Sequence, residues 1–103
     1  MRFMLTCRIH VERGNELAKN GTLGETIQTI MEELQPEAAY FSDMEGARGG
    51  YIVLNMDDAS QIPAMAEPLF LGFGATIQVH PVMTPEVLVK GMPAIERAAQ
   101  KYG

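Results

Sequence analysis

The order in which two hydrophobic periodicities follow one another constrains the fold of this chain most. Apolar residues alternate with mixed ones over residues 2–10, 38–43, 51–56 and 75–83, as they do along strands. Apolar residues recur at helical spacing between the first two of these segments and again between the last two. The sequence therefore predicts the order strand, helix, strand, strand, helix, strand, followed by a terminal helical segment.

Capping residues and prolines mark the first helix. Thr22 and Glu25 have the spacing of a capping box, and Pro36 marks where that helix must stop. The stretch before Thr22 contains Gly14 and Gly21, and we predict it to be a connection rather than a regular element.

Similar signals mark the remaining boundaries. Residues 45–50 are rich in glycine and predict the turn of a hairpin, and Asp57 or Asp58 can cap the second helix. The segment Thr84-Pro85-Glu86 predicts the start of the terminal helix, because it combines a capping side chain, a first-turn proline and an acid. Gly91 and Pro93 lie inside the terminal apolar stripe, so this helix is predicted to be kinked or split.

This order is the ferredoxin-like α+β arrangement, a βαββαβ sandwich with a four-stranded antiparallel sheet and a C-terminal helix. The first and third strands are central, and both crossover helices cover one sheet face. The odd-numbered side chains of the first strand then meet the helices. The other face is predicted to be bare and to carry Met4, Thr6, Arg8, His10, Tyr51, Val53, Asn55, Thr76, Gln78, His80 and Val82.

Size and composition limit the possible classes. The length of 103 residues and the hydrophobic content of 47% predict a single domain spanning residues 1–103. Its apolar stretches are far shorter than the roughly 20 residues of a membrane span, and no signal peptide is recognisable. Cys7 is the only cysteine and alternates with core-facing residues, which favours the cytoplasm and an unreactive buried thiol.

Charge and motifs argue against several functions. A net charge of −5 offers no basic surface for phosphate backbones, so we expect no nucleic-acid partner. The segment 48–53 faintly resembles the third strand of RNA-recognition domains, but only Tyr51 could stack a base. No phosphate-binding glycine motif, zinc-spaced Cys/His set or nucleophile elbow is present, and we expect neither cofactor nor metal.

The order of elements, the opening strand Arg2-Phe3-Met4-Leu5-Thr6 and the closing strand Val79-His80-Pro81-Val82 resemble the dimeric α/β-barrel superfamily. More narrowly, the chain is similar to small bacterial members of unknown function. The resemblance implies a homodimer whose open sheet faces meet, with pockets inside the barrel or between sheet and helices. Some members of the superfamily are cofactor-free monooxygenases, isomerases or haem-handling enzymes.

The polar residues of the predicted bare face are the candidate ligand-binding set. Arg8 can hold a carboxylate or phenolate through its planar donors, while His10 or His80 can act as a base near neutral pH. The two histidines are predicted to lie near opposite ends of the first strand, and we favour for each a role as a hydrogen-bonding group at the interface or its rim. The full set is Arg8, His10, Tyr51, Asn55, Gln78 and His80.

Three functions follow from these residues. The first is a homodimeric domain that binds a small organic molecule in a sheet-lined pocket. The second is a cofactor-independent monooxygenase or isomerase with a histidine base and Arg8 stabilising an enolate or phenolate. The third is a structural or protein-interaction dimer that uses the amphipathic C-terminal segment. The sequence does not choose an enzyme over a binding protein.

Overall fold

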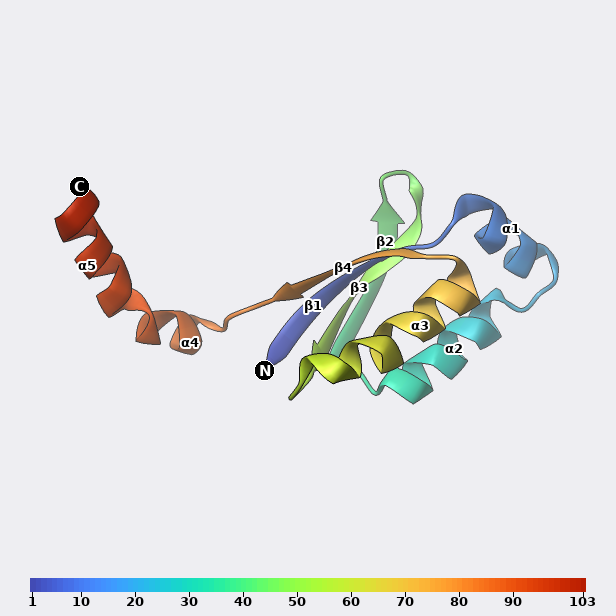
Figure 1. Ribbon diagram of the computed structural model, residues 1–103. Helices are drawn as coiled ribbons and strands as arrows, with labels where there is room; N and C mark the ends of the chain where they lie inside the picture. Colours follow the sequence, from blue (N-terminus) through green and yellow to red (C-terminus); the bar gives the residue numbers. More distant parts are fainter.

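The computed structural model describes residues 1–103 and contains one four-stranded antiparallel sheet with helices on one face (Figure 1). The strand order is β2-β3-β1-β4, so β1 and β3 are central as predicted. The architecture is therefore α+β and ferredoxin-like. The strands are β1 (Arg2–Arg8), β2 (Ala38–Met44), β3 (Ala47–Asn55) and β4 (Thr76–Pro81).

Two helices cover one face of the sheet, α1 lies near one end of it, and α4 and α5 lie away from it at the end of an extended segment (Figure 1). The covering helices are α2 (Leu23–Leu34) and α3 (Ile62–Phe73), which follow the predicted apolar stripes. Asp58 caps the 3-10 turn η1 (Ala59–Gln61) that leads into α3. The others are α1 (Val11–Lys19), α4 (Pro85–Lys90) and α5 (Met92–Tyr102).

The core lies between the sheet and these two covering helices. Leu5, Ile52 and Leu69 are the largest fully buried side chains, and they come from β1, β3 and α3. Cys7 is buried with them, and its desolvation raises the pKa of the thiol to about 11. The predictions that odd-numbered residues of β1 face the helices and that Cys7 belongs to the core are confirmed.

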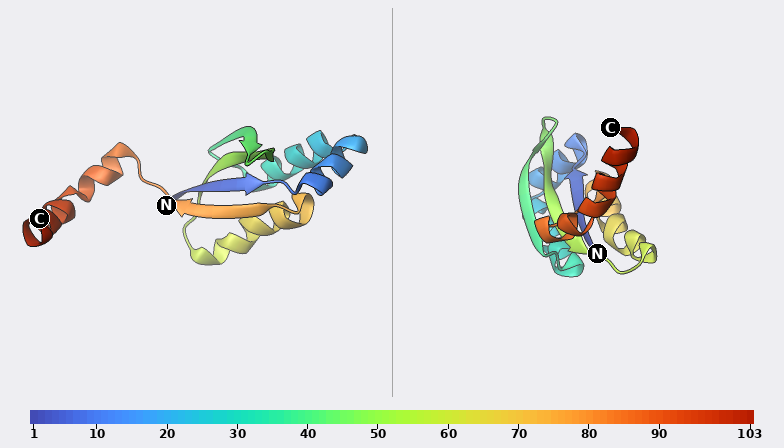
Figure 2. Two further views of the ribbon diagram at one scale, coloured as in Figure 1. Left: turned by 90° about the horizontal axis from the view of Figure 1, so that it is seen from above. Right: turned by 90° about the vertical axis from the view of Figure 1, so that its left-hand side faces the viewer.

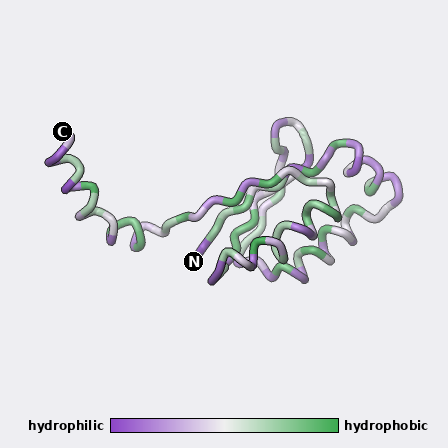
Figure 3. The backbone as a smooth tube through the Cα atoms, in the orientation of Figure 1, coloured by the Kyte–Doolittle hydropathy of each residue, from purple (hydrophilic) through white to green (hydrophobic).

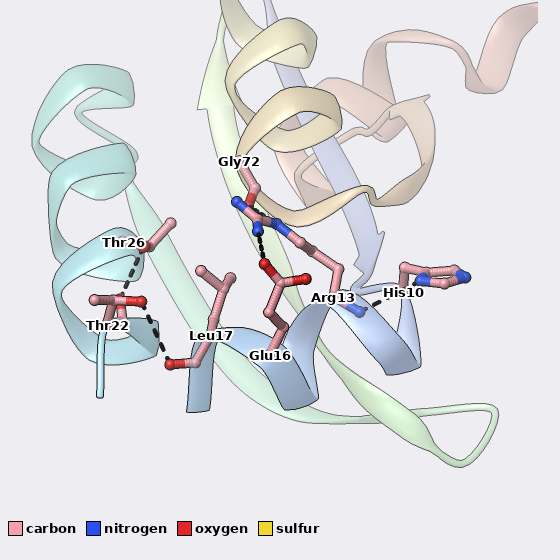
Figure 4. Close-up of polar contacts among 7 residues, drawn as sticks. All are labelled: His10, Arg13, Glu16, Leu17, Thr22, Thr26 and Gly72. Carbon is pink, nitrogen blue, oxygen red and sulfur yellow. Dashed lines mark hydrogen bonds and ion pairs between the residues drawn. The ribbon is translucent and has the colours of Figure 1, made fainter. Parts of the chain in front are cut away.

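The segment predicted to be a connection contains helix α1. Its sequence is mostly polar, and only Gly14 and Leu17 are buried, so its amphipathic pattern depends on few apolar residues. Gly14 allows α1 to approach β3 closely, because a Cβ there would lie 3.1 Å from Nη1 of Arg48. Thr22 precedes α2 as predicted but makes no capping hydrogen bond through its side chain. Its hydroxyl instead donates to the carbonyl of Leu17 at 3.4 Å (Figure 4).

The hairpin between β2 and β3 turns more tightly than predicted. Only Glu45 and Gly46 form the turn, and both have positive φ angles of 50° and 80°. Gly49 belongs to β3, where a Cβ would lie 2.3 Å from the carbonyl oxygen of Cys7. The glycines at 49 and 50 therefore permit close strand packing, and the predicted turn over 45–50 was too long.

Residues 83–103, which we call the C-terminal arm, extend away from the rest of the molecule (Figure 2). Thr84 caps α4 by accepting a hydrogen bond from the backbone N–H of Val87 at 3.3 Å, as predicted. The helical segment is split at Gly91, which confirms the predicted break. No residue of the arm is buried.

The arm makes the molecule elongated. Its principal extents are 59 × 28 × 20 Å and its radius of gyration is 17.2 Å, whereas a compact chain of this length has about 13 Å. None of the helices combines the length and the apolar character that a membrane crossing requires.

Candidate functional site

The face of the sheet opposite α2 and α3, which we call the open face, carries most of the predicted polar set. Cross-strand pairing places Thr6 between Tyr51 of β3 and Gln78 of β4. Arg8 pairs with Gly49 and Thr76, so it lies one pleat further along the same face. The pairing of Tyr40 with Tyr51 also resolves the register of β2, which the sequence left ambiguous.

A hollow on the open face gathers part of the candidate set around Arg8. Its volume is about 270 Å³. Its polar lining comes from three strands and the hairpin turn, so residues distant in the sequence meet here. The lining residues are Thr6, Arg8, Met44, Glu45, Tyr51, Thr76, Ile77 and Gln78.

The guanidinium of Arg8 is anchored at this hollow through one nitrogen. Its Nε donates a hydrogen bond to the carbonyl oxygen of Met44 at 3.2 Å. Arg8 forms no ion pair, since the two ion pairs of the chain join Arg2 to Glu37 and Arg13 to Glu16. A half-buried arginine that is held in place but lacks a carboxylate partner suits an anionic group from outside the chain.

Glu45 gives the hollow a second charge of opposite sign. It lies at the tip of the β2–β3 hairpin and lines the same hollow without pairing with Arg8. A group with several negative charges would be repelled by this carboxylate. The arrangement therefore suits a single negative charge, with Thr6, Tyr51 and Gln78 supplying further hydrogen bonds.

The structure does not place His10 on the open face, and this prediction was wrong. Strand β1 ends at Arg8, two residues earlier than predicted, and His10 becomes the N-cap of α1. Its Nδ1 accepts a hydrogen bond from the backbone N–H of Arg13 at 3.4 Å (Figure 4). The physical reason is that a helix start needs an acceptor for its free backbone N–H groups, and His10 supplies one.

His80 lies on the open face but away from Arg8. It pairs with Met4, whereas Arg8 pairs with Thr76, and four residues along a strand span roughly 13 Å. Nε2 of His80 lies 3.2 Å from Oε1 of Gln78, which links it to the edge of the hollow. The prediction that His80 lies opposite the start of the first strand is confirmed.

Asn55 lies at the far end of the face and belongs to a different cluster. It pairs with Arg2 on β1, and Arg2 forms an ion pair with Glu37 at 2.8 Å. The hydrogen bond from Arg2 lowers the pKa of Glu37, and Asn55 adds a smaller contribution in the same direction. Of the six predicted residues, Arg8, Tyr51 and Gln78 thus meet in one hollow, and His10, Asn55 and His80 do not.

The predicted ligand-binding set omitted five of the lining residues. Thr6 and Thr76 were placed on the bare face but not in the set, and Ile77 was expected on the opposite face. The other two are Met44 and Glu45. They were missed because the hairpin turn was predicted to span residues 45–50, which left the end of β2 without a defined position. The available signal was the pair Glu45-Gly46, since a two-residue turn with positive φ favours glycine.

A second hollow of about 470 Å³ lies between α2 and the β2–β3 hairpin. It is lined mainly by apolar residues, among them Ile9, Ile27 and Phe41. Its arginine, Arg48, already donates a hydrogen bond to Oδ1 of Asn15 at 2.8 Å. Arg48 is also exposed, so this hollow lacks a half-buried arginine such as Arg8.

Comparison with known proteins gives one family match. Residues 1–96 match the model of a family described as a domain of unknown function (DUF3303). No curated protein matches the chain. The match includes the whole sheet, helices α1–α4 and the first residues of α5, so the family pattern continues into the C-terminal arm.

Proposed function

The chain belongs to the DUF3303 family, and for this member we propose a homodimeric domain that binds a small organic anion at Arg8. The observation that carries the proposal is the state of this side chain. Arg8 is half-buried on the open face, fixed through Nε to Met44, and free of any carboxylate partner. Leaving a positive charge partly desolvated is unfavourable unless a ligand or solvent compensates it.

The surroundings of the open face support a second copy of the chain as its cover. Tyr40 of β2 is 68% exposed and Tyr51 of β3 is 39% exposed. Two apolar residues of the central strands, Met4 and Val53, lie on the same face. Such a mixed surface suits an interface with enclosed polar pockets. Face-to-face pairing would close the hollow at Arg8, in the manner of the dimeric α/β-barrel proteins that the sequence resembles.

The chemistry of the hollow favours a monocarboxylate or a phenolate as the ligand class. Arg8 can donate two parallel hydrogen bonds to a planar carboxylate, and Tyr51 offers an aromatic wall with a hydroxyl. Glu45 disfavours polyanions. The single buried thiol of Cys7 adds support for the reducing environment of the cytoplasm as the place of action.

Binding of benzoate to the purified chain tests this proposal. Isothermal titration of the native protein with benzoate should give saturable binding, and Arg8→Gln should weaken it at least tenfold through loss of a charge-assisted pair. Arg2→Gln is the matched control, since it removes the same charge from the same strand outside the hollow. Native mass spectrometry of protein from its own host should show a dimer with retained ligand mass.

Equal benzoate affinities for the native chain and Arg8→Gln would refute the site. A ligand-free dimer that also ignores benzoate would favour the structural-dimer alternative. The alternative of a cofactor-independent monooxygenase or isomerase is less well supported, because His10 caps α1 and His80 lies roughly 13 Å along the sheet from the row of Arg8.

A further inference from the structure

We propose that the C-terminal arm of each chain packs against the body of a second copy, with the apolar stripe of α4 and α5 as its contact surface. The body here means residues 1–82. This inference rests on the face-to-face dimer proposed above. It extends that proposal because it assigns a contact surface to the C-terminal arm, which packs on neither face of its own sheet.

The lengths of α4 and α5 call for a packing partner. They contain six and eleven residues and are separated by Gly91. Isolated helices shorter than about 12–15 residues are marginal in water, because nucleation is costly and burial supplies most helical stability. The arm buries no residue against its own body, so a surface outside the chain has to supply that burial.

An apolar stripe runs along one side of the arm. Leu88 is 44% exposed, Ile95 is 51% exposed and Tyr102 is 79% exposed, and Met92 lies between them at helical spacing. Apolar and polar segments alternate along the arm in Figure 3, as expected for amphipathic helices. Helix α5 is thus amphipathic like α2, but its apolar side is not buried against any part of the chain.

The arm leaves the body in a direction that suits an exchange between copies. The backbone N–H of Val82 donates to the carbonyl of Arg2 at 3.1 Å, which holds the start of the arm at the end of the sheet. In Figure 1 α5 then rises away from the side of the sheet that α2 and α3 occupy. A second copy seated on the open face would lie on the same side as α5.

The open face alone is small for a stable dimer. Four strands of about seven residues have a flat footprint of roughly 440 Å², whereas stable interfaces bury about 800 Å² per partner. Side-chain relief raises the accessible area of the face above this flat figure, and the two apolar helices of the arm would add to the area that a dimer buries.

Charge also favours docking of the arm on an acidic body. The arm holds three basic and two acidic residues, and residues 1–82 hold five basic and eleven acidic ones, which gives +1 and −6. Two bodies brought together repel one another, and exchanged arms reduce this repulsion. The body of a second copy therefore complements the arm both in apolar surface and in charge.

Sedimentation equilibrium of the full-length chain and two point variants tests the inference. Ile95→Asp places a charge on the stripe and should raise the dimer dissociation constant at least about thirtyfold, as expected for a buried anchor. Gln100→Asp adds the same charge on the opposite side of α5 and should change it less than about threefold. Circular dichroism of both variants checks that the body remains folded.

Isotope-mixed crosslinking identifies the partner. An equal mixture of ¹⁴N- and ¹⁵N-labelled chains is treated with a carbodiimide, and crosslinks from Lys90 or Lys101 to body carboxylates should join chains of different label. Crosslinks confined to one label would show folding back onto the arm's own body and overturn the inference. A dimer whose dissociation constant ignores Ile95→Asp would overturn the arm contact alone, whereas a monomeric full-length chain would refute the proposed dimer as well.

Discussion

The body and the arm have nearly the same apolar content but opposite burial. Hydrophobic residues make up 47% of the chain and ten of the 21 residues of the arm. Every buried residue nevertheless lies between positions 5 and 73. The difference shows that amphipathic periodicity determines where a helix forms, whereas burial depends on a second surface, which the sheet provides for α2 and α3 and nothing within the chain provides for α5.

Of the contrasts predicted between the body and the arm, the rate of thiol modification should differ by the largest factor. Cys7 is buried and its pKa is about 11, so roughly a thousandth of the thiol is ionised at pH 8 even before access is considered. In the Gln100→Cys variant a disulfide reagent should modify one thiol per chain at once and the second at least 1,000-fold more slowly. Rates are followed by absorbance of the released thiolate.

The unmodified chain supplies the reference for that experiment, since it should show the slow phase only. Rapid reaction of Cys7 in folded protein would mean that β1 opens readily, and the contrast between body and arm would then be lost.

Truncation of one leucine in each region should give the next largest contrast. Leu69→Ala removes a fully buried side chain of α3 and should lower the free energy of unfolding by about 2–5 kcal/mol. Leu88→Ala on the arm should change it by less than about 0.5 kcal/mol in dilute protein. Urea denaturation at two protein concentrations measures both. A loss in the Leu88 variant that grows with concentration would indicate an arm that is buried between copies.

Two glycine substitutions test how closely the backbone packs at two positions within the body. Gly49→Ala would place a Cβ 2.3 Å from the carbonyl oxygen of Cys7 and should cost about 1–3 kcal/mol or more. Gly24→Ala in α2 meets nothing within 4 Å and should stabilise the chain by about 0.4–1 kcal/mol. A thermal unfolding midpoint that stays unchanged or rises in Gly49→Ala would contradict the close packing of β1 on β3, and a midpoint that falls in Gly24→Ala would contradict the free space at residue 24.

The fold was largely predictable because its signals are local. Alternation along β1 and β4, the stripe of α2 and the cap at Thr84 each depend on a few neighbouring residues. Helix α1 was missed because it is mostly polar and only Gly14 and Leu17 are buried. Gly14 within it and Gly21 beyond its end were interpreted as loop signals, although the helix is amphipathic.

The candidate site was predictable only in part, for a geometric reason. Residues two apart on one strand share a face, so Arg8, Tyr51 and Gln78 could be placed together from register alone. His10 was misplaced because the end of β1 depends on competition with a helix start, where its side chain caps α1. Glu45 was missed because its position depends on a turn of two residues.

The ion pair between Arg2 and Glu37 should make the smallest contribution to the body. The hydrogen bond from Arg2 lowers the pKa of Glu37 from its usual 4.5 in the folded state. A carboxylate with a lowered pKa contributes stability that is present above its unfolded value and is lost as the pH falls through the folded value. Stability should therefore decline slightly more steeply below about pH 4.5 in the native chain than in Glu37→Gln.

Both side chains are exposed, so solvent and salt screen the pair and the effect should remain small. Urea midpoints from about pH 7 to about pH 3 measure it, and Arg2→Gln should reproduce the result of Glu37→Gln. The double variant should add nothing further, since each substitution already removes the pair. Additive losses would instead assign separate roles to the two residues, and the start of β1 at Arg2 would then depend on its backbone hydrogen bond with Val82 rather than on this ion pair.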